Sequence, residues 1–199
     1  SLKIVKKKTF NLFLVLSLLM GLVVIISNYL VQFPINYLNL QEILTYGAFT
    51  YPVTFLITDL ANRAYGKKVA KNIVYIGFVV GVVLTFTIAT NFNDLISIRI
   101  AIGSGLAFLV AQSIDVNIFD RLRKNKIWYV APLVSSLIGS AIDTLLFFSI
   151  SFYNTGVAWV SLAFGDFVVK IIIALMMLVP FKLIIKKIKE NTSKKISYK

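Results

Sequence analysis

Six apolar stretches dominate this chain of 199 residues, and each is long enough to cross a lipid bilayer. They lie at roughly 10–33, 43–62, 72–90, 98–119, 127–152 and 157–185. A helix rises about 1.5 Å per residue, so about 20 residues span a hydrocarbon core about 30 Å thick. We therefore predict an all-α, polytopic membrane protein in which a six-transmembrane-helix bundle occupies residues 10–185.

The composition favours the same class of protein. Hydrophobic residues make up 58% of the chain and charged residues 15%, whereas soluble domains average about 45–50% and about 25%. Because a soluble domain needs a more highly charged surface, this balance excludes an ordinary soluble fold. The length leaves no room for a second folded domain beside the bundle.

The net charge of +13 comes from basic residues that gather on one side of the predicted membrane. Nearly all Lys and Arg residues lie in an N-terminal tail (1–9), after the second and fourth apolar stretches, or near a C-terminal tail (186–199). Short basic connections stay in the cytoplasm. We therefore predict that both termini are cytoplasmic, and that the charge reflects topology rather than binding to nucleic acid.

The chain contains no cysteine and no histidine. The first absence excludes disulfides and thiol chemistry, and the second removes the side chain that titrates most easily near neutral pH. The sequence shows no metal-ligand cluster, glycine-rich phosphate loop or Ser–His pair. We therefore expect no catalytic residue, no metal and no cofactor, and any proton coupling would have to use carboxylates.

Four aspartates and a lysine lie inside the apolar stretches, namely Asp59, Asp115, Asp143, Asp166 and Lys170. A charge at the bilayer centre costs roughly 2.5–3.5 kcal/mol on insertion scales, so such residues normally face a protein interior or an aqueous path. If all five were ionised, their excess negative charge would require a protonated carboxyl, an inward-reaching arginine or a positively charged cargo. The pattern favours a polar cavity within the bundle, as in a transporter.

Polar side chains of the fifth stretch fall on one helical face: Ser136, Ser140, Asp143, Thr144 and Phe147. Hydroxyl groups, a carboxylate and an aromatic ring suit a small polar heterocycle. The carboxylate would accept hydrogen bonds from the N–H groups of such a ligand. The alternative is an interhelical seam, in which small residues pack and the carboxylate bonds to a neighbouring helix.

Gln112 and Asp115 share a face of the fourth stretch, three residues apart. An amide and a carboxylate in that position could recognise donors and acceptors on a ligand. Alternatively, Asp115 neutralises Arg121 or Arg123 near the cytoplasmic end.

Asp59 and Arg63 lie four residues apart near the cytoplasmic end of the second stretch, with Asn62 between them. This spacing predicts either an ion pair or a gate whose carboxylate changes partners between conformations.

Asp166 and Lys170 have the same spacing, but they lie deeper in the sixth stretch. We expect Lys170 to pair with Asp166 or, across the bundle, with Asp143. Such a pair need not add stability, because desolvation can exceed the Coulomb gain.

Two backbone features bear on the bundle. Pro52, in the middle of the second stretch, removes a backbone hydrogen bond and predicts a kink. Gly77 and Gly81 of the third stretch have the spacing of small residues that lets helices approach closely.

Motifs along most of the chain resemble the queuosine precursor transporter family, also called the vitamin uptake transporter family. The similar segments are 27–34, 46–52, 55–59, 112–116, 119–123, 128–132 and 142–144, together with Ser135, Ser136, Gly139, Phe147, Phe148, Asp166 and Lys170. They follow one another in the family's order over roughly 26–185, which is more specific than any single motif.

The resemblance implies a multi-pass protein of the bacterial inner membrane that imports deazaguanine bases, precursors of the tRNA nucleoside queuosine. Such a purine-like cargo has a planar ring and an amidine edge, which suits carboxylate, amide and aromatic side chains. The expected substrate-binding residues are Asp143, Gln112, Asp115, Asp166, Ser140, Thr144 and Phe147. The expected gating residues or charge partners are Lys170, Asp59, Asn62 and Arg63.

Three interpretations stay open at this point. The first is a secondary carrier that works alone in the lipid bilayer, as a monomer or a homodimer. The second is a substrate-binding subunit that needs a separate ATP-driven coupling module. The third is a scaffold or assembly protein of the membrane, which would show no ligand-induced thermal shift.

Overall fold

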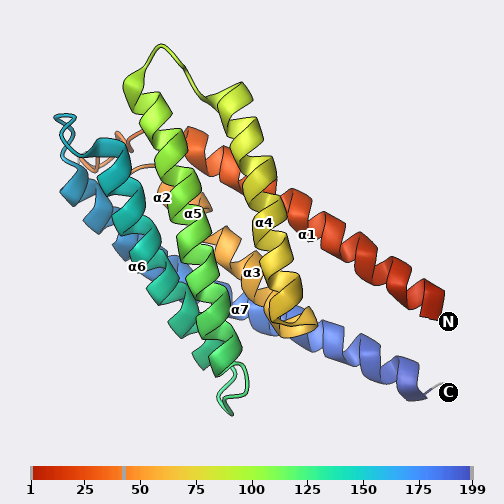
Figure 1. The fold of residues 1–199 in the computed structure, drawn as a ribbon. Helices are drawn as coiled ribbons and strands as arrows, with labels where there is room; N and C mark the ends of the chain where they lie inside the picture. Colours follow the sequence, from red (N-terminus) through yellow and green to blue (C-terminus); the bar gives the residue numbers. More distant parts are fainter. Residues whose placement is uncertain (1, 42–43, 198–199) are drawn as a thin grey trace.

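The computed structural model describes the backbone of residues 2–41 and 44–197 and the side chains of residues 12–41 and 44–187. In that part of the chain, every regular element is a helix (Figure 1). The helices are α1 (Leu2–Leu30), α2 (Gly47–Thr50), α3 (Val53–Tyr65), α4 (Lys67–Leu84), the π-helical turn η1 (Thr85–Ala89), α5 (Leu95–Leu122), α6 (Val130–Phe152) and α7 (Trp159–Ser197). The prediction of an all-α chain is confirmed for these residues.

Five helices within the described residues are long and apolar enough to cross a membrane. They are Leu12–Leu30, Lys67–Ala89, Leu95–Leu122, Val130–Phe152 and Trp159–Lys187. The stretch predicted at 43–62 is not one of them, so the predicted count of six spanning helices is not confirmed by the described residues. Most side chains of the predicted basic tails, 1–9 and 186–199, lie outside the described residues.

The second apolar stretch is broken because Pro52 has no backbone N–H to continue the helix. The chain turns between α2 and α3, where the N–H of Thr54 donates to the carbonyl of Tyr51 at 3.1 Å. The hydroxyl of Thr54 donates to the same carbonyl at 2.7 Å. The carbonyl of Tyr51 is thus satisfied within this turn, which lets the interruption lie inside the protein.

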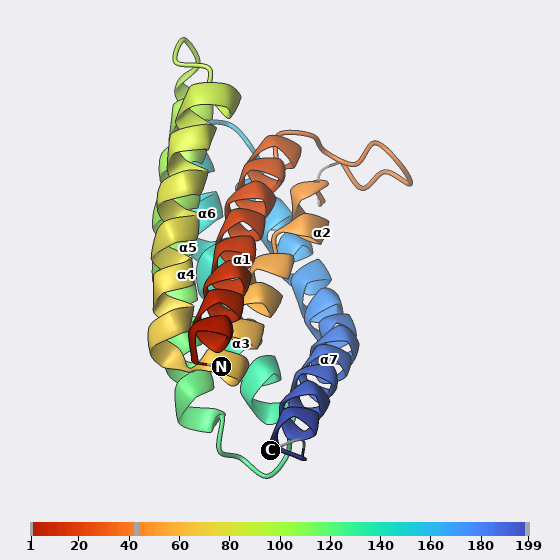
Figure 2. The same ribbon diagram turned by 90° about the vertical axis from the view of Figure 1, so that its right-hand side faces the viewer.

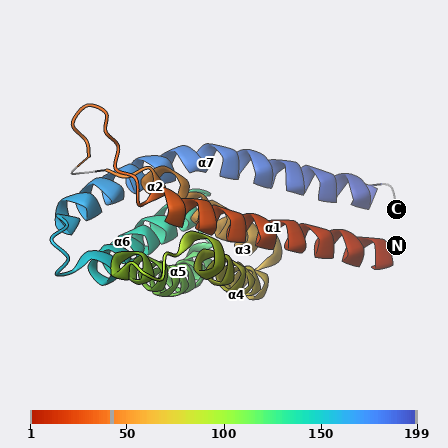
Figure 3. The ribbon, with the colours of Figure 1, turned by 90° about the horizontal axis from the view of Figure 1, so that it is seen from above.

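The helix α3 lies at the centre of the bundle, in contact with α1, α4, α5, α6 and α7. Figure 2 shows α1 and α4 beside one another on one side of the molecule and α7 on the other. The long helices α5 and α6 form a closely packed pair. The start of α1 and the end of α7 lie at the same end of the bundle (Figures 1 and 3).

Small residues bring α1 and α4 together, as the spacing of Gly77 and Gly81 predicts. A Cβ atom on Gly77 would collide with the side chain of Met20, and one on Gly81 would lie 2.9 Å from Cγ1 of Val24. Met20 and Val24 belong to the main apolar core, which α3, α4 and α5 complete. The central position of α3 places its polar side chains against three of the long helices.

Candidate functional site

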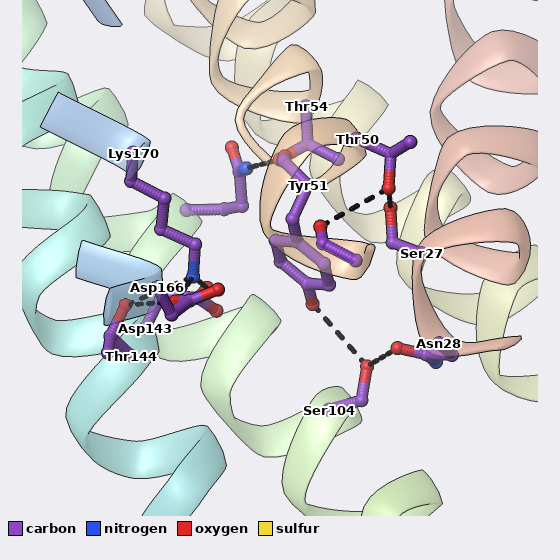
Figure 4. Close-up of polar contacts among 12 residues, drawn as sticks. Ser27, Asn28, Thr50, Tyr51, Thr54, Ser104, Asp143, Thr144, Asp166 and Lys170 are labelled. Carbon is purple, nitrogen blue, oxygen red and sulfur yellow. Dashed lines mark hydrogen bonds and ion pairs between the residues drawn. The ribbon is translucent and has the colours of Figure 1, made fainter. Parts of the chain in front are cut away.

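A buried lysine on α7 binds two aspartates, one on α6 and one on α7. The Nζ atom of Lys170 lies 2.8 Å from Oδ2 of Asp143 and 2.6 Å from Oδ2 of Asp166. The hydroxyl of Thr144 donates to Asp166 at 2.8 Å and accepts a bond from Lys170 at 3.0 Å (Figure 4). We refer to these four residues as the charge cluster. Both pairings predicted for Lys170 are therefore confirmed.

One oxygen of the charge cluster is left without a donor. Within the described residues, Oδ1 of Asp143 is buried and has no hydrogen-bond partner. A buried acceptor without a partner is costly, so such an atom suggests a place for a ligand donor.

A small cavity, here called the upper cavity, adjoins the charge cluster. It is lined by Ser27, Asn28, Val31, Gly47, Tyr51, Asp143, Phe147, Asp166 and Lys170. Its volume of about 10 Å³ is enough for no more than about one water molecule. The bundle is therefore closed around this cavity, and a larger ligand would need the helices to separate.

The aromatic ring of Tyr51 lies between two groups of polar side chains (Figure 4). On one side, Nζ of Lys170 lies 5.2 Å from the ring centroid, a favourable distance for a cation–π contact. On the other side, the Tyr51 hydroxyl lies 3.4 Å from Oγ of Ser104, which also donates to Oδ1 of Asn28. Tyr51, the residue just before Pro52, thus connects the charge cluster to Ser104 of α5 and, through Ser104, to Asn28 of α1.

Sequence reasoning missed Tyr51 and Asn28 as members of this site. The amide of Asn28 also donates to Oγ1 of Thr85 at 3.2 Å, at the start of the π-helical turn. Ser27, the neighbour of Asn28, shares a hydrogen bond of 2.8 Å with Thr50 of α2. The sequence signal for Asn28 was its position beside Ser27, since the two are polar residues near the end of the otherwise apolar first stretch.

Gln112 lies in the seam between α3 and α5 rather than beside the upper cavity. Its Oε1 accepts from the hydroxyl of Thr58 at 2.6 Å, and its Nε2 donates to Oγ1 of Thr54 at 2.9 Å. Both ends of the amide are thus engaged in bonds between helices, which fix α3 against α5.

A second buried acidic site includes Asp59, in the middle of α3. Asp59 accepts hydrogen bonds from Ser136 at 3.0 Å and from Ser135 at 3.4 Å. Cβ of Asp115 on α5 lies beside Gly139, one turn along α6 from the serines that bond to Asp59. We refer to Asp59 and Asp115 as the acid pair.

The second cavity, here called the lower cavity, adjoins the acid pair. It is lined by Pro52, Phe55, Leu56, Asp59, Pro132, Ser136, Ser140, Ala174, Met177, Leu178 and Phe181. Its volume of about 20 Å³ corresponds to about one water molecule.

The predicted polar face of α6 connects the two cavities. Ser136 and Ser140 line the lower cavity, and Asp143 and Phe147 line the upper one. Thr144 is bonded within the charge cluster. The single face therefore serves both as an interhelical seam and as a wall of the two cavities, and its role in binding a ligand stays a prediction.

The ion pair predicted between Asp59 and Arg63 is wrong for the described residues. Arg63 instead donates to the carbonyl of Arg123 at 2.7 Å, and its guanidinium lies 5.1 Å from the Phe119 ring centroid. Arg63 follows Asp59 by one helical turn, on the same face of α3. Its side chain therefore reaches the connection between α5 and α6. Asn62 donates to the Val116 carbonyl at 3.2 Å and so also joins α3 to α5.

Asp115 does not neutralise Arg121 or Arg123 either. Arg123 pairs with Asp120 at 3.6 Å near the surface, whereas Asp115 is completely buried. Asp115 and Asp120 point to different sides of α5, so one carboxylate is buried and the other lies near the surface.

Comparisons with known proteins identify a family and relatives of this chain. Residues 45–185 match the family described as "Putative vitamin uptake transporter". The chain is 34% identical over 183 residues to the "Queuosine precursor transporter" of Escherichia coli (strain K12), covering 83% of this chain and 82% of the relative. It is 35% identical over 182 residues to the "Probable queuosine precursor transporter" of Haemophilus influenzae, covering 77% of each. No solved structure matches the chain.

Proposed function

This chain belongs to the vitamin uptake transporter family, and from that premise we propose that it imports queuosine precursors as a secondary carrier. The chain is a multi-pass bacterial membrane transporter, since it has several helices long and apolar enough to cross a membrane and it has bacterial relatives of that description. The proposed cargo is a planar deazaguanine base, as the family resemblance implies. The two relatives described above carry queuosine precursor transport in their names.

We propose six crossings, in which α2 and α3 together make the second, and cytoplasmic termini. The segment from Gly47 to Tyr65 would be about 28 Å long as a helix, close to the thickness of the hydrocarbon core. The start of α1 and the end of α7 lie at one end of the bundle, as an even number of crossings requires (Figure 3). The basic residues gather at connections that this topology directs to the cytoplasm.

The observation that carries the proposed function is the unpartnered Oδ1 of Asp143 beside the upper cavity. An amidine edge donates two parallel N–H groups, and a carboxylate accepts such a pair. Lys170 and Thr144 hold the charge cluster in place, so the acceptor is oriented before a base arrives. Substrate binding would then supply the donor that this oxygen lacks.

Aromatic rings next to Asp143 suit the flat faces of such a base. Tyr51 and Phe147 both line the upper cavity. Stacking of a base on an aromatic side chain contributes about 1–3 kcal/mol. Asp166, within the charge cluster, completes the proposed site, whereas Ser140, on the same face of α6, lines the lower cavity.

The helix break is the proposed hinge of the carrier. The upper cavity includes Tyr51 and the lower cavity includes Pro52, so the break adjoins both. Discontinuous helices surround the binding sites of many secondary transporters. Because both cavities are closed to anything larger than about one water, α2 and α3 would have to move to admit a base.

Uptake of a labelled deazaguanine base into proteoliposomes that contain only the purified protein tests this proposal. We expect uptake by the natural sequence and its loss in Asp143→Asn, while Asp120→Asn, a carboxylate outside both cavities, retains it. Normal uptake by Asp143→Asn would disprove the site. Binding of the base without any transport would favour the substrate-binding subunit that needs an ATP-driven module.

A further inference from the structure

The acid pair consists of two facing carboxyl groups that are removed from solvent. Asp59 is 2% exposed and Asp115 is 0% exposed. Asp59 accepts from the hydroxyl of Ser135 at 3.4 Å, and a Cβ atom on Gly139, one turn further along α6, would lie 3.4 Å from Cβ of Asp115, so both carboxyl groups approach the same part of α6. Asp59 comes from α3 and Asp115 from α5, so the contact joins the central helix to one of its neighbours.

Among the residues that the structure describes, no cation forms an ion pair with either member of the acid pair. Lys170, the buried ammonium group, is bound to Asp143 and Asp166. Arg63, one turn beyond Asp59, donates to the carbonyl of Arg123 instead.

The other elements around the pair contribute no titratable group from the described residues either. From α6 come only the hydroxyls of Ser135 and Ser136. The α7 side chains at the lower cavity are Ala174, Met177, Leu178 and Phe181, and the buried residues of α4 near α3 are Ala70, Ile73 and Val74.

Within the described part of the chain, the hydrogen bonds around the pair leave both oxygens of Asp115 free to share a proton with Asp59. Ser135 and Ser136 donate to Asp59, but neither oxygen of Asp115 has a well-aligned donor among the described residues. Two ionised carboxylates in contact repel one another, and each carries a desolvation cost. One proton between them removes a charge and supplies the hydrogen bond that Asp115 lacks, as in other carboxyl pairs that cannot both ionise.

We propose that Asp59 and Asp115 form the proton-binding site of the carrier, and that they share one proton in this closed conformation. The proton binds from the outer side and leaves to the cytoplasm when α3 moves and the two carboxyl groups separate. This coupling rests on the carrier function proposed above, whereas the shared proton does not.

The fold supplies a connection between the proton site and the proposed base site. The break at Pro52 adjoins the lower cavity, and Tyr51 adjoins the upper one. A hinge motion at the break would therefore change both sites together. The polar face of α6 also contacts both, through Ser136 at Asp59 and through Asp143 at the upper cavity.

Transport under imposed gradients tests the coupling. In proteoliposomes clamped at zero voltage, we expect the natural sequence to concentrate a neutral deazaguanine base about tenfold per pH unit, inside alkaline, for one proton per base. Asp59→Asn and Asp115→Asn resemble the protonated pair, so we expect them to exchange labelled for unlabelled base but to lose accumulation driven by the pH gradient. Asp120→Asn, a carboxylate near the surface, serves as the matched control.

Each outcome has a separate meaning. Exchange by the natural sequence without a response to the pH gradient, or accumulation that follows a sodium gradient instead, would overturn the proton site. These measurements on the natural sequence do not depend on either variant folding. Absence of both uptake and exchange would instead contradict the proposed function.

Infrared spectroscopy of the purified protein tests the shared proton without any transport. We expect the natural sequence at neutral pH to show one more protonated carboxyl group than the Asp59→Asn, Asp115→Asn double variant. Identical spectra in the carboxylic acid region would overturn the shared proton, whatever the transport assays give.

Discussion

The ammonium group of Lys170 lies 2.8 Å from Oδ2 of Asp143, so that a cation on α7 is held by a carboxylate on α6. Both side chains are buried, and the second oxygen of the carboxylate has no protein donor among the described residues. Burial of an ion pair contributes little net stability, because desolvation offsets the attraction. We therefore infer that Lys170 orients this carboxylate for a ligand.

Replacement of Lys170 by methionine should destabilise the protein strongly. The change leaves Asp143 and Asp166 buried without their cation, and removal of one partner of a buried pair costs about 3–5 kcal/mol. We expect a clear fall in the midpoint of thermal unfolding in detergent. Lys124→Met, which removes an exposed lysine, should leave the midpoint unchanged. Equal midpoints for the two variants would contradict this role.

Truncation of Tyr51 should weaken binding of the base more than removal of its hydroxyl. Tyr51→Ala removes the ring, and loss of base stacking is worth about 1–3 kcal/mol, which corresponds to an increase of about 5- to 150-fold in KM. Tyr51→Phe keeps the ring and loses only a long hydrogen bond of 3.4 Å to Ser104. We expect its KM to stay close to that of the natural sequence. Similar KM values for the two variants would show that the ring does not contact the substrate.

Substitution of Gln112 should affect stability more than substrate affinity. Gln112→Leu keeps most of the volume but removes both hydrogen bonds to α3, and each unsatisfied buried group costs about 1–3 kcal/mol. We expect a lower unfolding midpoint and an unchanged KM. An unchanged midpoint with a strongly raised KM would instead support the prediction from sequence that Gln112 binds the ligand.

A methyl group at Gly139 should disturb the packing beside the acid pair. A Cβ atom there would lie 2.6 Å from Cε1 of Phe55 and 3.4 Å from Cβ of Asp115. Overpacking of a core costs typically about 1–3 kcal/mol, so we expect Gly139→Ala to unfold at a lower temperature. The matched control is Gly105→Ala, because its new Cβ would lie 3.5 Å from Phe78 and Val82, an ordinary contact distance. A midpoint for Gly139→Ala at or above that of Gly105→Ala would refute the packing argument.

Several properties of the fold follow from the sequence because they depend on neighbours along one helix. Apolar length predicts the membrane-crossing helices, and the missing N–H of Pro52 predicts a kink in the second stretch, where the structure has an interruption between α2 and α3. The helical period places Ser136 through Phe147 on one face of α6, and Gly77 and Gly81 on one face of α4. Each of these predictions concerns a single helix and its own hydrogen bonds.

Apart from the partners of Lys170, only the tertiary structure decided which charged and polar groups meet. Asp59 bonds to the serines of α6 rather than to Arg63, and Gln112 bonds to the threonines of α3 rather than lining a cavity. These contacts depend on the order of the helices and on the rotation of each helix about its axis. Apolar surfaces pack in many rotations at similar free energy, so the spacing of residues along a chain does not specify partners on another helix. The sequence by itself thus determined a helical membrane protein with buried charges, and the packing of α3 at its centre decided how those charges divide into two sites.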